Sequence, residues 1–209
     1  MCVAITTPNR AFRPTLEQLA QCEHANRHGS GLAWLNGKRV EYCKNLPIAE
    51  IHRLLADIAG PAIVHFRIAS VGGVDPQLCH PFPITHRAEL RQQGTARSVL
   101  FHNGTWSEHR SAAAHYGLTF PKREPLSDTR IAASLIARFG FDWLKRADYC
   151  RWALLDRKGI RRIGHWHEVD GCHYSNLGWQ PHTFGGSYEY LQPGFFDDDD
   201  DDDCEPGCP

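Results

Sequence analysis

Cys2, the second residue of the chain, combines a nucleophilic side chain with a position next to the N-terminus. An initiator Met followed by a small residue is normally removed, so we expect the mature chain to begin with a cysteine that carries a free α-amino group. A thiol attacks as its thiolate. An α-amino group with a pKa of roughly 7.7–8.0 can accept the thiol proton near neutral pH. One residue would then supply both nucleophile and base. The alternative is a small, oxidisable residue at a frayed end.

A nucleophile at a terminus needs a rigid support, and the sequence after Cys2 predicts one. Residues 2–7 are apolar and β-branched, which is typical of a buried strand. Further strands are predicted over 62–70, 98–102, 152–155, 159–163 and 174–177, with a hairpin over 32–42 about a type I′ turn at Asn36-Gly37. Helices are predicted after the N-cap residues Thr15 and Ser127, and over 47–59. This order indicates a layered α+β protein.

Length and composition indicate one folded domain over 1–196, followed by a short tail over 197–209. A chain of 209 residues with 42% hydrophobic residues can bury one sizeable core. The opening segment has no basic flank and no long apolar run, so we predict no signal peptide. No later segment has the length of a membrane span, and we expect no membrane association.

Eight cysteines are scattered without close pairs at metal-ribbon spacing, so we expect reduced thiols in the cytoplasm. The net charge is −1, but Asp197–Asp203 and Glu205 supply eight of the 24 acidic residues. The body is therefore basic, which favours an anionic substrate or partner, or its own acidic tail. We predict that the aspartate run is disordered and serves solubility or a partner contact.

Six segments in order resemble the class II glutamine amidotransferase domain, a branch of the N-terminal nucleophile (Ntn) hydrolases. After Cys2 they are Asn26-Arg-His-Gly-Ser-Gly-Leu-Ala-Trp, His65-Phe-Arg-Ile-Ala-Ser, Cys79-His-Pro-Phe, His102-Asn-Gly and Ser127-Asp-Thr-Arg. Tyr174-Ser-Asn also has a counterpart in that family. Each motif alone is an ordinary turn, loop or helix cap. Their order downstream of a cysteine at position 2 makes the resemblance specific, and it spans residues 2–178.

The resemblance implies a four-layer αββα sandwich, with two antiparallel sheets between helical layers, and amide hydrolysis through a thioester on Cys2. It also implies an oxyanion hole formed by the Asn103 side-chain amide and the Gly104 backbone N–H. Gly104 has a separate rationale, because the residue after Asn in such a turn often needs a positive φ.

Free glutamine is a zwitterion at its α-carbon, so its pocket should offer one cation and one anion. Arg67 and Asp128 match the family positions for binding the α-carboxylate and the α-ammonium. The alternative for this pair is a structural salt bridge. Ser70, where the family usually has Thr, and His102 complete the expected substrate-binding set.

Two departures from the family pattern concern the surroundings of the site. Val3 follows the nucleophile where the family commonly has Gly, which would alter the approach to the thiol. The sequence around His28-Gly-Ser-Gly also differs, which would change the gating of the pocket.

Three other clusters of histidine, cysteine or arginine residues have weaker functional signals. His165-Trp-His167 with Cys172 and His173 could suggest zinc, but we predict neither a metal nor a cofactor. Cys204 and Cys208 lie beyond the aspartate run, and we interpret them as part of a dispensable tail. Arg87, Arg91, Arg97, Arg161 and Arg162 show no nucleic-acid-binding motif, so we favour a solvated basic face.

The predicted function is glutamine hydrolysis to glutamate and ammonia. Family members usually pass the ammonia to a synthase domain fused downstream, and this chain ends before one. We therefore expect a separate synthase subunit to receive the ammonia, or the protein to act alone. The alternatives are an Ntn amidase acting on another γ-glutamyl or amide compound, and a non-catalytic interaction protein. The intact set of site residues argues against the last.

Overall fold

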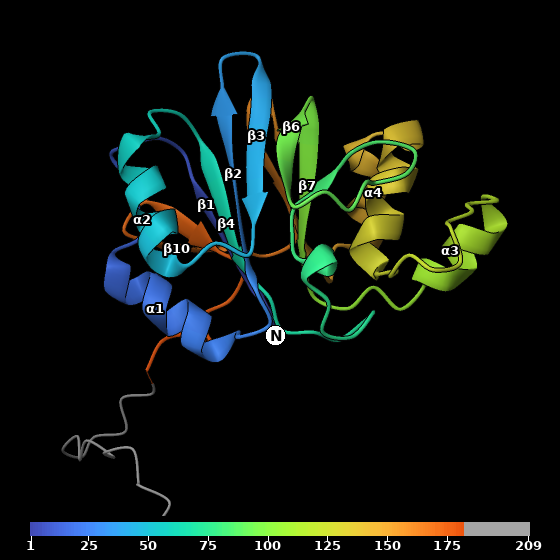
Figure 1. The fold of residues 1–209 in the computed structure, drawn as a ribbon, viewed down its shortest axis with the longest axis horizontal. Helices are drawn as coiled ribbons and strands as arrows, with labels where there is room; N and C mark the ends of the chain where they lie inside the picture. The colour runs from blue at the N-terminus through green and yellow to red at the C-terminus, as the bar shows by residue number, and fades with distance from the viewer. Residues whose placement is uncertain (182–209) are drawn as a thin grey trace, which may run out of the picture.

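Two antiparallel sheets form the centre of the molecule in a computed structural model that describes residues 1–181 (Figure 1). The larger sheet has the strand order β10-β11-β1-β4-β2-β3-β6, and the smaller has the order β5-β7-β8-β9. The larger sheet comprises β1 (Val3–Thr7), β2 (Ser30–Asn36), β3 (Arg39–Lys44), β4 (Ala62–Phe66), β6 (Gln93–Ala96), β10 (His167–Val169) and β11 (Cys172–Tyr174). The smaller sheet comprises β5 (Phe82–Pro83), β7 (Ser98–Asn103), β8 (Arg151–Asp156) and β9 (Gly159–Ile163).

Helices cover the outer faces of both sheets (Figure 1). The α-helices are α1 (Leu16–Ala25), α2 (Ile48–Asp57), α3 (His109–His115) and α4 (Asp128–Phe139), and 3₁₀ helices span Pro76–Leu78 and Phe141–Ala147. In Figure 1, α1 and α2 lie beside the larger sheet, and α4 lies on the other side, beyond β7.

Three separate hydrophobic layers identify the fold as a four-layer sandwich. The first contains Leu19, Ile51 and Leu55 from the helices, packed with Ile5 and Val64 of the larger sheet. The second joins the facing sides of the two sheets and includes residues of β2, β3, β4, β6, β7 and β8. The third lies between the smaller sheet and α4. The predicted αββα arrangement is therefore confirmed.

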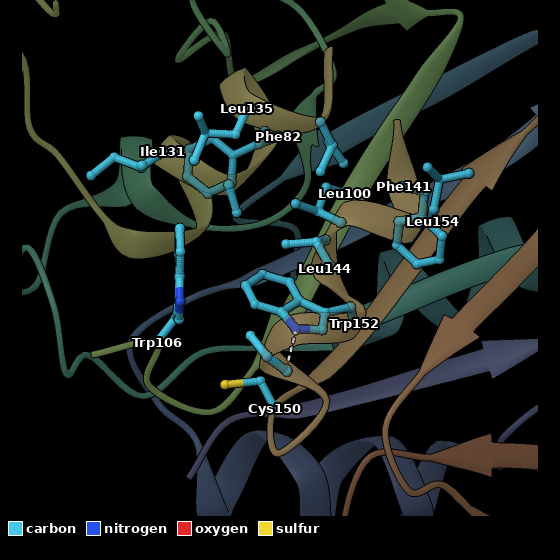
Figure 2. Close-up of a cluster of buried hydrophobic side chains, with 14 of the residues drawn as sticks. Phe82, Leu100, Trp106, Ile131, Leu135, Phe141, Leu144, Cys150, Trp152 and Leu154 are labelled. Atoms are coloured by element: carbon cyan, nitrogen blue, oxygen red, sulfur yellow. Dashed lines mark hydrogen bonds between the residues drawn. The ribbon is translucent and has the colours of Figure 1, made fainter. Parts of the chain in front are cut away.

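The third layer is built around Trp152 of β8 (Figure 2). Its ring is fully buried, and its indole N–H donates to the carbonyl of Ala147 at 2.9 Å. Leu100 of β7 and Leu135 of α4 belong to the same layer. This packing fixes α4 against the smaller sheet, so the residue that begins α4 has a defined position.

The strand that follows Cys2 lies inside the larger sheet, paired with β4 on one side and β11 on the other. All five residues of β1 are buried. Val3 and Ile5 face the helical layer, because successive side chains of a strand point to opposite faces. The predicted rigid support for the N-terminus is therefore confirmed. Val3 packs in the core between sheet and helices.

Local signals in the sequence located most elements. Thr15 forms a capping box with Gln18 at the start of α1, and the Ser127 side chain accepts a hydrogen bond from the Arg130 N–H at the start of α4. The helix predicted over 47–59 is α2, and the strands predicted over 98–102, 152–155 and 159–163 are β7, β8 and β9. We predicted no strand at β5 or β6 and no helix at α3.

Three predicted boundaries were wrong. Asn36 pairs with Arg39, so the hairpin loop is Gly37-Lys38, one residue later than predicted. The strand predicted over 62–70 ends at Phe66, and the segment 67–70 belongs to the pocket wall instead. The strand predicted over 174–177 ends at Tyr174, because the next two residues hydrogen-bond to the N-terminal strand and to Cys2.

The predicted domain end at residue 196 and the acidic tail over 197–209 lie outside the described residues, as do Cys204 and Cys208. Within residues 1–181, the helices are too short or too polar to cross a bilayer.

Candidate active site

Cys2 lies at the end of a central strand of the larger sheet, immediately before β1, and it is half-buried. The thiol donates to the Ile68 carbonyl at 3.2 Å, and the Ile68 N–H donates to the sulfur at 3.3 Å. Residue 68 follows β4, the neighbour of β1, so the pairing of two strands determines the position of the sulfur.

Burial raises the pKa of the Cys2 thiol, while the hydrogen bond from Ile68 and the nearby charge of Arg67 act in the opposite direction. The neutral thiol therefore predominates near neutral pH. Nucleophilic attack from this site requires a base that removes the thiol proton.

Six of the seven predicted site residues line one pocket beside the Cys2 sulfur. They are Cys2, Arg67, Ser70, His102, Gly104 and Asp128. These residues lie directly before β1, in the segment after β4, at the end of β7 and at the start of α4, so the sequence separations between them are large. The free space is about 20 Å³, room for about one water molecule. The pocket must widen before a molecule as large as glutamine can enter.

Arg67 is buried in the pocket wall, and its side chain bonds to the backbone of its own loop, residues 67–75. Its Nη2 donates to the carbonyl of Val71 at 3.3 Å and to that of Gly73 at 2.8 Å. Its Nη1 is buried and has no hydrogen-bond partner among residues 1–181. A buried, unpartnered guanidinium N–H is well suited to bind a carboxylate.

Asp128 is the first residue of α4 and is also buried. Its carboxylate accepts from the Trp106 N–H at 3.0 Å and from the Thr129 N–H at 2.8 Å. Asp128 and Arg67 do not form an ion pair within 4.0 Å in the described part of the chain. The alternative of a structural salt bridge between them therefore has no support.

Asn103 is the last residue of β7, and Gly104 follows it. Gly104 has φ of +133°, and an added Cβ would lie 3.0 Å from the Cys150 sulfur. The backbone conformation therefore favours glycine, and a Cβ would also press on the Cys150 side chain. Asn103 is fully buried behind the pocket wall, and its Nδ2 lies 2.8 Å from the Ser175 hydroxyl oxygen.

His102 is a buried ring stacked on Trp152, with ring centroids 3.9 Å apart. Burial lowers the pKa of His102 to about 4, although the charge of Asp128 acts to raise it. The ring is therefore neutral at neutral pH. Its Nδ1 lies 3.0 Å from the Thr129 hydroxyl, and its Nε2 is buried without a partner among the described residues.

Ser70 belongs to loop 67–75, and its hydroxyl lies 3.5 Å from that of Thr105. His28 supports the same loop, since the Ala69 N–H donates to its Nδ1 at 2.9 Å. The segment around His28, which departs from the family pattern, thus contacts the loop at the pocket wall.

Two groups of site residues were missed at the level of sequence. His80 and Thr129 line the pocket, and His80 Nε2 lies 3.0 Å from the Thr129 hydroxyl. Both stand inside the motifs Cys79-His-Pro-Phe and Ser127-Asp-Thr-Arg, which was the available signal. Ser175 and Asn176 follow β11, and the Asn176 amide donates to the Cys2 carbonyl at 2.7 Å.

The histidine and arginine clusters outside the site make ordinary contacts with neighbouring side chains. The rings of His165 and His167 meet edge to face, 4.6 Å apart. Groups of three or more histidine, cysteine or acidic side chains arranged to hold a metal ion were not found within residues 1–181. Arg161 pairs with Asp156, and Arg162 donates to Thr6. Arg91 and Arg97 line a separate hollow at the sheet edges.

Comparison with solved structures finds a similar fold in the glutamine phosphoribosylpyrophosphate (PRPP) amidotransferase from B. subtilis, solved in complex with ADP and GMP. The TM-score is 0.56 at 16% sequence identity, and the match covers 83% of this chain and 41% of the other. A structure described as the allosteric regulatory enzyme of purine biosynthesis matches with a TM-score of 0.47 at 21% identity, covering 78% and 35%.

This chain thus spans less than half the length of either protein. No protein-family model and no curated protein matches the sequence. At 16% identity the first match concerns the fold alone, and it agrees with the predicted arrangement of two antiparallel sheets between helical layers.

Proposed function

We propose that this chain is a glutamine amidotransferase-type hydrolase that converts glutamine to glutamate and ammonia through a thioester on Cys2. The observation that carries the proposal is the pocket beside the Cys2 sulfur, whose walls include the guanidinium of Arg67 and the carboxylate of Asp128. A cation and an anion beside one nucleophile match the zwitterionic end of glutamine. The glutamine amidotransferase among the similar folds supports the same proposal.

The first step requires a free α-amino group on Cys2. Met1 is 76% exposed, so it is accessible for removal. The amine then accepts the thiol proton, and the thiolate attacks the side-chain carbonyl carbon of glutamine. The carbonyl π electrons move to oxygen, and the N–H groups of Asn103 and Gly104 stabilise the negative charge.

Collapse of this intermediate breaks the carbon–nitrogen bond. The α-ammonium of Cys2 gives its proton to the leaving nitrogen, and ammonia departs. Water then attacks the thioester, with the amine as base again, and the carbon–sulfur bond breaks to release glutamate and the thiol. Each proton taken by the amine is returned, so the cycle balances.

Labelling followed by intact-mass measurement tests the nucleophile. A glutamine analogue with a reactive diazoketone should add once per chain, the adduct should map to Cys2, and Met1 should be absent. The Cys2→Ala variant serves as the control and should remain unlabelled. Active protein that retains Met1, or an adduct on another cysteine, would contradict the proposal.

The substrate is tested by comparing turnover of free glutamine with that of other γ-glutamyl amides. We expect glutamine to be preferred, because Arg67 and Asp128 both require its charged α-carbon. Equal turnover of amides that lack the α-amino or α-carboxyl group would favour the alternative amidase. For the ammonia, we propose delivery to a separate synthase subunit, to be sought by pull-down from the native host.

A further inference from the structure

The hydroxyl of Ser175, directly after β11, lies between two parts of the proposed catalytic apparatus. Ser175 is fully buried. Its oxygen accepts from the Ala4 N–H of β1 at 2.8 Å, and the Nδ2 of Asn103 lies 2.8 Å away on the other side. This single side chain therefore links the strand that follows the nucleophile to the predicted oxyanion donor.

Two polar groups at this contact, one donor and one acceptor, have no hydrogen-bond partner within the described part of the chain. When both neighbours donate to the Ser175 oxygen, the hydroxyl hydrogen needs an acceptor elsewhere, and none of the hydrogen bonds among residues 1–181 supplies one. The Oδ1 of Asn103 is buried and has no donor among the same residues. A spare donor and a spare acceptor thus belong to adjacent side chains, and such buried unpaired groups are costly.

Turning the Asn103 amide by half a revolution pairs the spare donor with the spare acceptor, and it leaves the two N–H bonds of Nδ2 without an acceptor among residues 1–181. The nitrogen and oxygen of a carboxamide have nearly the same shape, so the exchange leaves the packing unchanged. The Ser175 hydroxyl then donates to Asn103 Oδ1 and still accepts from the Ala4 N–H. Both N–H bonds of the Asn103 amide are freed from Ser175.

We propose that Ser175 is a positioning residue that holds the Asn103 amide by its oxygen and so leaves its nitrogen to stabilise the oxyanion. The inference rests on the proposed function, in which that amide is an oxyanion donor. The orientation of the Asn103 amide matters, because an amide oxygen directed at the oxyanion would repel its negative charge, whereas an N–H stabilises it. Without Ser175, neither end of the Asn103 amide has a partner among residues 1–181, so its orientation is no longer held.

The same segment also holds the nucleophile. Asn176 donates to the Cys2 carbonyl at 2.7 Å, and the Ser175 N–H donates to the Ala4 carbonyl at 2.9 Å. Ser175 and Asn176 therefore set the position of β1 relative to β7, which carries Asn103. The oxyanion donor and the backbone of the nucleophile are therefore held by two consecutive residues.

A double-mutant cycle in glutamine hydrolysis tests this assignment. Asn103→Ala should lower kcat by about 10²- to 10³-fold, as the loss of an oxyanion donor does. Ser175→Ala should lower kcat by roughly 10-fold or more with little change in KM. In the Asn103→Ala background, Ser175→Ala should cost less than about threefold, because the group that it orients is absent.

Three controls separate positioning from loss of structure. Ser134→Ala removes another fully buried serine, whose hydroxyl has no partner among the described residues, and should leave kcat unchanged. Alkylation of Cys2 by iodoacetamide needs no oxyanion hole, so its rate should be the same in wild type and Ser175→Ala. Ser175→Thr, which keeps the hydroxyl, should recover most of the lost kcat.

The outcomes are distinguishable. If Ser175→Ala lowers kcat equally in both backgrounds, or slows alkylation to the same extent, its effect arises from disruption of β1, and the inference is overturned. Full activity of Ser175→Ala also overturns it and leaves the proposed function intact. A wild-type chain that does not hydrolyse glutamine overturns the proposed function, and the inference with it.

Discussion

Cys2 is held by the backbone of one residue and the side chain of another. The Ile68 carbonyl and N–H both contact its sulfur, and Asn176 holds its carbonyl. Because burial raises the pKa of this thiol, the base that removes its proton decides how much nucleophile is present at a given pH. At this scale the proposed chemistry depends on a few groups that can be changed one at a time.

Arg67→Ala should raise KM for glutamine by roughly 10- to 150-fold, since a hydrogen bond to a charged group contributes about 1.5–3 kcal/mol. The effect on kcat should be smaller, because the α-carboxylate does not change during the reaction. Steady-state kinetics check this. Arg53→Ala is the control: Arg53 is an exposed arginine of α2 paired with Glu50, and its loss should leave KM unchanged. Unaltered KM in Arg67→Ala would contradict the pocket assignment.

The value of kcat/KM should rise with pH and level off above the pKa of the Cys2 amine, expected near its reference value of roughly 7.7–8.0. The sign follows from the role of the amine, which must be unprotonated to accept the thiol proton. A pH–rate profile with glutamine checks this. A chain extended before Cys2, in which that amine is an amide, should be inactive at every pH. A flat profile between about pH 6 and 9 would exclude the amine as base.

At the scale of elements, the start of α4 places Asp128 in the pocket. The Ser127 side chain caps this helix by accepting from the Arg130 N–H, and Trp152 and Leu135 fix the helix against the smaller sheet. The analogous cap at Thr15 begins α1, on the other side of the molecule (Figure 1). The two caps allow a matched comparison.

Ser127→Ala and Thr15→Ala should each reduce the free energy of unfolding by about 1 kcal/mol, the usual effect of losing an N-cap. Only Ser127→Ala should also raise KM for glutamine, because α4 carries Asp128 and α1 carries no site residue. Denaturant titration and steady-state kinetics measure the two effects. A rise in KM in both variants would show that the cap acts through general loosening of the fold.

For the whole molecule, the layer between the two sheets contains buried rings as well as apolar side chains. His65 is completely buried and His80 is nearly so, with ring centroids 4.0 Å apart, and His65 Nε2 lies 3.2 Å from the His102 carbonyl. Burial lowers the pKa of His65 to about 3 and that of His80 well below its ordinary value of 6.5. Folding therefore keeps these rings neutral.

Stability should consequently fall in acid. The unfolded chain binds protons at these histidines below about pH 6.5, while the folded chain does not until about pH 4 for His102 and about pH 3 for His65. Each histidine should contribute a loss of about 1.4 kcal/mol per pH unit over its window. Denaturant titrations across this range check the slope, and His65→Gln should reduce it. Stability that stays constant from about pH 6.5 to 4 would contradict the neutral state.

Much of the architecture was accessible from sequence because its determinants are local. Thr15 and Ser127 act on N–H groups three residues away, and the apolar, β-branched run after Cys2 predicts a buried strand wherever that strand pairs. The ordered motifs similarly identified the fold class. Boundaries such as Phe66 and Tyr174 were misplaced, since those strands end where other parts of the chain take over their hydrogen bonds.

The sequence by itself determined the identity of the candidate nucleophile, the helix starts and the set of residues from which a glutamine site could be built. Only the tertiary structure decided how they meet. The contacts of Ser175 with Asn103 and of Asn176 with Cys2 span 72 and 174 residues, and they exist because strand register brings β11, β1 and β7 together. Local hydrogen bonding is written into neighbouring residues, whereas register depends on the packing of both sheets at once.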